Sequence, residues 1–236
     1  MQEKDSSKNV AALDVRNKIS EIINHAKKYH ADVMAVIKYA RKEQIITLIN
    51  DGRIKILGEN RVQDAISRWQ KDSDLIPFKN NYDIHFIGHL QKNKVKYSIN
   101  LFNSIDSIDS CELASLINDF AQKNNKKIPV MLQLKINERE TQYGIKENDF
   151  DKEYTMISKL PNIIVRGIMC IGPLTDDEKE IAQAFRKARS VYERYFTDEF
   201  ILGFKNYLSM GMSSDYKIAL DEGANLIRIG NFLFSN

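Results

Sequence analysis

The residue whose type and position best suit covalent chemistry is Lys38, which follows the five apolar residues 33–37 at the end of an expected strand. A lysine whose stem leaves a buried strand has a partly desolvated amine, and desolvation favours the neutral, nucleophilic form of that amine. The alternative is an ordinary strand-end lysine whose ammonium group reaches water. Position alone favours the second interpretation.

Two glycine turns near the C-terminus have the composition of a phosphate site. They are LSMGMSSD at 208–215 and IRIGNFLF at 227–234. Backbone N–H groups at a glycine turn or helix start donate to phosphate, and Ser209, Ser213 and Asn231 add side-chain donors. Neither segment matches a P-loop or a GxGxxG motif, so nucleotide binding has little support. The turns make Lys38 a plausible anchor for a phosphorylated cofactor.

Arg228 lies between two isoleucines in the last expected strand, where a guanidinium needs a partner. Either a carboxylate pairs with it, or it donates to a ring nitrogen of a bound cofactor. His85 and His89 are four residues apart but straddle a glycine at a strand end, which favours a hydrogen-bonded histidine near the site over a metal pair. We expect no metal site, and we assign no catalytic residues.

The elements that position these residues alternate between short β-rich runs and longer helical patterns. The eight expected strands cover residues 33–37, 55–57, 84–88, 101–105, 130–136, 163–169, 206–210 and 225–229. The expected helices cover residues 10–29, 41–50, a stretch from about 60, a stretch from 109, 147–159, 176–195 and 213–222. Asp109 and Ser213 are expected to cap the helices that follow them.

Alternation of this kind predicts a parallel sheet, and eight repeats favour an α/β fold closed into a (β/α)8 TIM barrel over an open, doubly wound sheet. No glycine- or proline-rich linker divides the chain. We therefore expect one domain over residues 1–236, with a helical segment at 1–30 packed on the barrel. In such a barrel the residues after the C-terminal ends of the strands form the active face.

The composition narrows the functional class. A net charge of +3 over 236 residues is too small to indicate nucleic acid binding. The two cysteines, Cys111 and Cys170, form no zinc-like spacing and suit a reducing compartment. The polar N-terminus carries no secretory signal, and no apolar run approaches the length of a membrane span. We expect a cytoplasmic protein that does not bind membranes.

Six segments together resemble the signatures of the YggS/PROSC family, the pyridoxal 5'-phosphate (PLP)-binding proteins of vitamin B6 homeostasis. The segments are AVIKYA (35–40), LGENRVQDA (57–65), IHFIGHLQKNKVK (84–96), GIM (167–169), LSMGMSSD and IRIGNFLF. They occur in the family's order over about residues 33–234, which is nearly the whole chain.

The resemblance implies the barrel of alanine racemase, fold type III of the PLP enzymes, without that enzyme's second, β-rich domain. It implies that Lys38 holds PLP as a Schiff base, that Asn60 lines the cofactor site, and that Arg228 faces the pyridine nitrogen. The implied phosphate cradle consists of Ser209, Met210, Gly230 and Asn231.

This chain departs from the family pattern at Asn231, where a Thr, Ser or Ala is usual. It also has Gln142 where many members have a lysine, and Lys135 where they have an asparagine. The asparagine amide can still donate to phosphate. A secondary PLP contact through the missing lysine does not carry over to this chain.

The expected function is PLP homeostasis without a robust turnover reaction, with PLP-dependent apoenzymes as possible recipients and a monomeric protein. A guanidinium only donates, so Arg228 at the ring nitrogen would keep that nitrogen unprotonated and weaken the ring as an electron sink. One alternative is a small alanine-racemase-like enzyme acting on amino acids. Another is a barrel for a different phosphorylated ligand, in which Lys38 acts only electrostatically.

Overall fold

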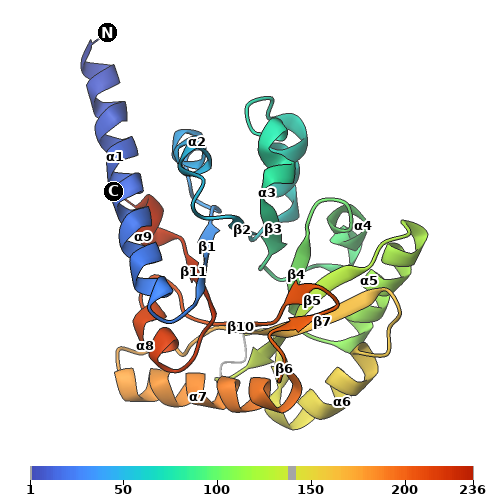
Figure 1. Ribbon diagram of the computed structural model, residues 1–236. Helices are drawn as coiled ribbons and strands as arrows, with labels where there is room; N and C mark the ends of the chain where they lie inside the picture. The colour runs from blue at the N-terminus through green and yellow to red at the C-terminus, as the bar shows by residue number, and fades with distance from the viewer. Residues whose placement is uncertain (1, 138–141, 236) are drawn as a thin grey trace.

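Parallel strands close into a barrel in the computed structural model, which describes residues 2–137 and 142–235 (Figure 1). Within these residues the eight barrel strands are β1 (Asp32–Val36), β2 (Ile56–Glu59), β3 (Asp83–Phe86), β4 (Ser104–Ile108), β5 (Ile128–Lys135), β7 (Ile163–Cys170), β10 (Tyr207–Ser209) and β11 (Leu226–Ile229). Each strand pairs in parallel with the next in this order, and β11 pairs with β1. The predicted (β/α)8 barrel is confirmed.

The closure is visible in the register of β1, whose Met34 lies opposite Ile56 of β2 on one side and Arg228 of β11 on the other. The first and last strands are thus neighbours although they are nearly two hundred residues apart in sequence. Short additions lie outside the barrel: β6 (Ile145–Lys146) pairs with the end of β5, and β8 (Phe200–Ile201) with β9 (Phe204–Lys205) forms an antiparallel hairpin.

Helices surround the strands (Figure 1). They are α1 (Gln2–Lys27), α2 (Lys42–Asp51), α3 (Val62–Ile66), α4 (Val95–Ser98), α5 (Cys111–Lys123), α6 (Glu147–Ile157), α7 (Glu178–Tyr195), α8 (Tyr216–Asp221) and α9 (Asn231–Phe234). A π-helical turn at Ser67–Lys71 extends α3, and 3-10 turns cover Ile76–Asn81 and Lys92–Lys94. No helix in the described part of the chain combines the length and apolar character that a membrane span requires.

Helix α1 lies along β1, α2 and α9, so the N-terminal helix and the end of the chain meet on one side of the barrel (Figure 1). Lys18 Nζ donates to the Ser235 carbonyl at 2.9 Å. The helix is fixed by its apolar face: Val15, Ile19 and Ile22 are almost fully buried.

The fourth strand begins three residues later than expected. The sequence predicts it at 101–105, whereas β4 covers Ser104–Ile108. Leu101 and Phe102 are buried, but both donate their N–H groups to the Ser98 carbonyl in the turn that follows α4. Their apolar character reflects burial in a turn, which a short apolar run does not distinguish from a strand.

The two predicted helix caps are also wrong. Ser110, not Asp109, caps α5, because its Oγ accepts from the Leu113 N–H at 3.3 Å. Ser213 does not cap α8, which begins three residues further on at Tyr216. The Ser213 hydroxyl instead contacts the chain after β11, a contact that belongs to the candidate site.

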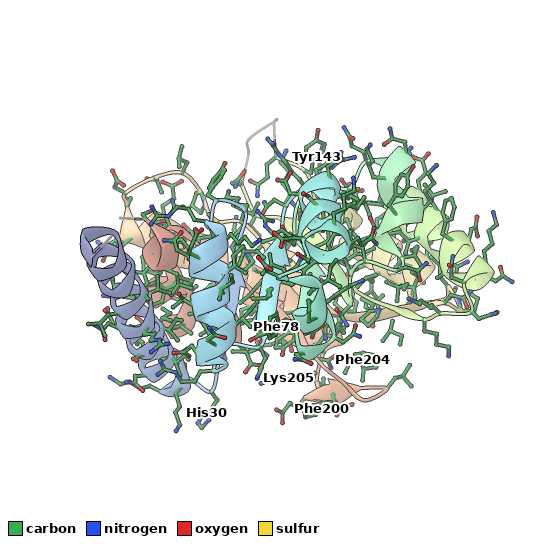
Figure 2. All side chains as sticks on the ribbon, turned by 90° about the horizontal axis from the view of Figure 1, so that it is seen from above. His30, Phe78, Tyr143, Phe200, Phe204 and Lys205 are labelled. Atoms are coloured by element: carbon green, nitrogen blue, oxygen red, sulfur yellow. The ribbon has the colours of Figure 1, made fainter. Side chains whose placement is uncertain are left out.

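The two ends of the barrel differ in their surroundings. His30 precedes β1 and Lys205 precedes β10, and Figure 2 shows both at one edge of the molecule, with Phe200 and Phe204 of the hairpin. Tyr143, which follows β5, lies at the opposite edge. That second edge is where the strands end.

Candidate functional site

A cavity of about 430 Å³ lies at the C-terminal ends of the strands. Its size falls in the range of small-molecule sites. Its lining residues are Val36, Lys38, Asn60, Ile87, Met169, Ile171, Met212, Ser213, Ser214, Arg228, Gly230 and Asn231. The cavity thus brings together five of the predicted site residues from three strand ends, while Ser209 and Met210 are absent from its lining.

Lys38 stands two residues beyond the end of β1 and enters the cavity from a turn. The sequence predicts a partly desolvated amine, but the side chain is exposed, with Nζ 4.8 Å from the ring centroid of Tyr39. The strand is buried and the lysine is not, because the chain leaves the barrel after Ile37. Any desolvation of the amine has to come from a ligand that fills the cavity.

Asn60 directly follows β2 and borders the cavity with its amide. Its Oδ1 is buried and has no hydrogen-bond partner within the described residues. The neighbouring loop approaches very closely: a Cβ on Gly88 would lie 2.1 Å from the Asn60 carbonyl oxygen. Only glycine permits that approach, so Gly88 fixes the position of Asn60 at the cavity edge.

Arg228 is 4% exposed and uses neutral acceptors. Its Nη1 donates to Ser209 Oγ at 2.8 Å, and its Nη2 donates to the Cys170 carbonyl at 2.7 Å. Burial lowers the pKa of the guanidinium, and the nearby carboxylates of Asp215 and Asp106 oppose that shift. No carboxylate of the described residues forms an ion pair with it, so the first of the two alternatives, a paired structural arginine, is wrong.

Ser209 and Met210 are buried and do not line the cavity. Ser209 is fully buried, and its hydroxyl accepts from Arg228. The Met210 side chain is also buried, and its N–H donates to the Leu226 carbonyl at 3.2 Å. Their contact with a phosphate group stays a prediction. In this structure Ser209 holds the arginine that borders the cavity.

Ser213 joins the two glycine turns. Its Oγ accepts from the N–H groups of Gly230 at 3.3 Å and Phe232 at 3.1 Å. The loop that carries it is held by Asp215, whose Oδ1 accepts from the Met212 N–H at 2.5 Å. These bonds tie the two turns together on one side of the cavity, which Ser213, Ser214, Gly230 and Asn231 line.

Glu59 ends β2 directly before Asn60, and no role for it was predicted from the sequence. This fully buried carboxylate accepts from Arg68 Nη1 at 2.7 and 2.9 Å and from Trp69 Nε1 at 3.0 Å. Arg68 Nη2 also reaches the Lys38 carbonyl at 3.5 Å. Burial raises the pKa of Glu59, and its two partners counteract that shift. The π-helical turn at 67–71 supplies both partners, and such turns are frequent at functional sites.

The two remaining departures from the family pattern fall in different places. Gln142 Nε2 donates to the carbonyl of Ile171, a cavity residue, at 3.3 Å. Lys135 ends β5 and lines a separate hollow. The apolar walls, Ile87, Met169 and Ile171, were not predicted; the rule that sites follow strand ends would have found them. Within the described ranges, no group of three or more His, Cys, Asp or Glu side chains is arranged to hold a metal ion.

Comparison with known proteins places these observations in a family. The family model described as alanine racemase, N-terminal domain, matches residues 12–236. The pyridoxal phosphate homeostasis protein of Aquifex aeolicus is 34% identical over 204 residues, which is 86% of each chain. The protein of the same name from Helicobacter pylori strain 26695 is 32% identical over 94% of this chain and 99% of its own.

Solved structures of related proteins have the same barrel fold. PipY of Synechococcus elongatus with PLP bound superposes with a TM-score of 0.80 at 28% identity and covers 94% of this chain and 100% of its own. Alanine racemase of Clostridium difficile superposes with a TM-score of 0.66 at 17% identity over 94% of this chain and 56% of its own. The second likeness concerns the fold alone.

Proposed function

We propose that the chain binds PLP and acts in intracellular vitamin B6 homeostasis, because it belongs to the alanine racemase N-terminal domain family and, within it, to the pyridoxal phosphate homeostasis proteins. The observation that carries the proposal is the convergence of Lys38, Asn60, Arg228 and Gly230 on one cavity. These residues come from three separate strand ends, and each matches a motif of the family.

The residues present fit the cofactor. The cavity has room for a small aromatic phosphate, Ile87, Met169 and Ile171 give it apolar walls, and the buried Asn60 Oδ1 has no hydrogen-bond partner in the part of the chain that the structure describes. Gly230 allows close approach: a Cβ there would lie 3.2 Å from the Val36 carbonyl oxygen. A planar, phosphorylated ring such as PLP fits between apolar walls that are bordered by polar groups.

Each residue has a distinct task in the proposed site. Lys38 Nζ holds the aldehyde carbon of PLP as a Schiff base, and Arg228 donates to the ring nitrogen. Ser213, Gly230 and Asn231 border the position of the phosphate. PLP supplies an electrophilic carbon and, when its ring nitrogen is protonated, an electron sink.

Arg228 bears on the choice between carrier and enzyme. A guanidinium is a donor without an acceptor, so at the ring nitrogen it holds that atom unprotonated. Its partners in the structure are a hydroxyl and a carbonyl, and neither supplies a proton to the ring. An arginine at the ring nitrogen weakens the electron sink but does not by itself exclude catalysis; the relatives named pyridoxal phosphate homeostasis protein support a protein that holds PLP over a small racemase.

The proposal also covers the protein's partners, location, oligomeric state and domain extent. PLP-dependent apoenzymes are the proposed recipients, because the cavity opens at a strand-end face that another protein can reach. We also propose a cytoplasmic location, a monomeric state and a single domain over 1–236. The packing of α1 on β1, α2 and α9 supports the single domain.

The deciding experiment is the visible absorption spectrum of the PLP-loaded protein before and after borohydride reduction, followed by peptide mass spectrometry. We expect a band that reduction bleaches and a covalent label on Lys38 only. Lys38→Ala should lose the band and the label. Lys55→Ala, at the opposite end of the barrel, should keep both. Equal labelling of the Lys38→Ala variant would contradict the proposal.

A further inference from the structure

A second, smaller hollow of about 290 Å³ adjoins the cofactor cavity, and Asn60 borders both. Its lining residues are Asn60, Arg61, Val62, Gln63, Phe86, His89, Gln91 and Lys94. All of them belong to two sequence motifs, LGENRVQDA at 57–65 and IHFIGHLQKNKVK at 84–96. PLP binding uses only the asparagine of these eight, which leaves the other seven without an assigned task.

The lining of this hollow is basic and contains no carboxylate. Arg61 and Lys94 supply two positive charges, and Gln63 and Gln91 supply amide donors. Throughout residues 2–137 and 142–235, neither the Arg61 nor the Lys94 side chain has a hydrogen bond or ion pair. Two like charges that line one hollow repel each other unless an anion lies between them.

Two nearby cations outside the hollow are paired with carboxylates. Lys92, two residues before Lys94, forms an ion pair with Glu112. Arg68, seven residues after Arg61, contacts the buried Glu59. Carboxylates are therefore available in this region of the chain, and neither cation that lines the hollow pairs with one within the described residues.

His89 also lines the hollow, and two contacts position its ring. Its Nδ1 lies 3.5 Å from Asp109 Oδ2, and its ring stacks on Tyr143 with centroids 3.6 Å apart and planes 14° apart. Tyr143 lies at the edge of the molecule opposite His30 and Lys205 (Figure 2). When Nδ1 donates to Asp109, a neutral ring leaves Nε2 as an acceptor, so His89 is not counted among the donors to an anion.

We propose that this hollow binds the anionic group of a small molecule, a carboxylate or a phosphate, next to the cofactor. Arg61 and Lys94 make charge-assisted hydrogen bonds to its oxygens, and the side-chain amides of Gln63 and Gln91 complete the donor set. The site adds a second ligand to the proposed function. Because Asn60 borders both spaces, a molecule bound there lies beside PLP.

The test is calorimetric titration of the PLP-free protein with sodium phosphate and, separately, with sodium succinate, both at constant ionic strength. We expect saturable binding of at least one probe, weakened about tenfold by Arg61→Gln and by Lys94→Gln. Lys96→Gln removes an equal charge two residues away, outside the hollow, and should change the affinity less than about twofold. Binding of phosphate alone identifies a phosphate subsite, and binding of succinate alone identifies a carboxylate subsite.

Absence of saturable binding by either probe would overturn the proposal. So would an affinity that Arg61→Gln and Lys94→Gln leave unchanged, since the anion would then occupy the cradle near Ser213 instead. Borohydride labelling of Lys38 is measured on the same variants. A protein that labels normally but binds neither probe contradicts the second site and leaves the proposed function standing.

Discussion

Arg228 of β11 donates to the neutral hydroxyl of Ser209 of β10 at 2.8 Å, and this bond holds the buried guanidinium at the edge of the cofactor cavity. A carboxylate at the same place would compensate the positive charge. The serine leaves the charge intact, so the arginine remains available as a donor to a ligand.

Replacing Arg228 by Gln removes the charged donor from the cavity. We expect PLP affinity to fall about tenfold or more, because a hydrogen bond to a charged group contributes about 1.5–3 kcal/mol, and we expect the absorption band to shift. The measurement is a spectroscopic PLP titration. Ser209→Ala keeps the guanidinium and should produce a smaller loss. A band and affinity identical to the wild type would rule out the contact with the ring nitrogen.

Replacing Ser213 by Ala releases the N–H groups of Gly230 and Phe232 from the hydroxyl that orients them. We expect weaker binding of PLP by about threefold to tenfold, in line with the loss of one or two neutral hydrogen bonds. Ser214 borders the same cavity but is exposed and makes no such bond, so Ser214→Ala is the matched control. Equal effects of the two substitutions would contradict the assigned role.

Replacing Arg68 by Ala leaves the fully buried Glu59 carboxylate without its ion-pair partner. We expect the free energy of unfolding to fall by about 3–5 kcal/mol, measured by urea denaturation. Adding Glu59→Gln to Arg68→Ala removes the uncompensated charge and should restore part of the loss. The control is Arg189→Ala, whose exposed pair with Glu193 contributes less than about 1 kcal/mol.

His85 lies inside the barrel and has different partners in its two protonation states. When charged, it donates from Nδ1 to Asp106 at 2.7 Å and from Nε2 to Asp83 at 3.1 Å. When neutral, Nε2 accepts from Arg166 Nη2 at 2.8 Å. Burial lowers the pKa of His85, but the two carboxylates outweigh burial and the net shift is upward.

A raised folded-state pKa means that the folded protein binds the proton more tightly than the unfolded chain. The stabilisation by His85 is therefore fully present below about pH 6.5, the unfolded value, and is lost as the pH rises through the folded value. Urea denaturation between about pH 5.5 and 9 should show stability falling with pH over this window. His85→Gln should reduce that slope; a slope unchanged in the variant would refute the account.

The two free cysteines should differ in reactivity. Cys170 is fully buried, and burial raises its pKa to about 12, with the Arg228 guanidinium opposing the shift. Cys111 is half-buried at the start of α5. Because the thiolate is the reactive form, iodoacetamide at neutral pH should alkylate Cys111 and spare Cys170 until the protein is unfolded. Mass spectrometry of the native protein gives the ratio, and rapid labelling of Cys170 would contradict the burial.

The alternation of apolar runs and helical patterns was sufficient to predict the barrel. Burial on both faces gives parallel strands their continuous apolar runs, and those runs are local properties of the chain. The rule that sites follow the ends of strands then placed Lys38 and Gly230 on the same face, and both border the cavity. The fourth strand was misplaced because a buried turn at Leu101 and Phe102 has the same local composition as a strand.

The sequence by itself thus determined the barrel, the strand-end position of Lys38 and the segments that line the cavity. Only the tertiary structure decided the partners within it: Ser213 with Gly230, Arg68 with Glu59 and the Lys38 carbonyl, and Arg228 with Ser209. Periodicity reports which face of an element is buried, but a polar side chain's partner depends on how distant strands meet when the barrel closes. For the same reason the basic hollow beside Asn60 is invisible in the sequence, where its two halves lie more than twenty residues apart.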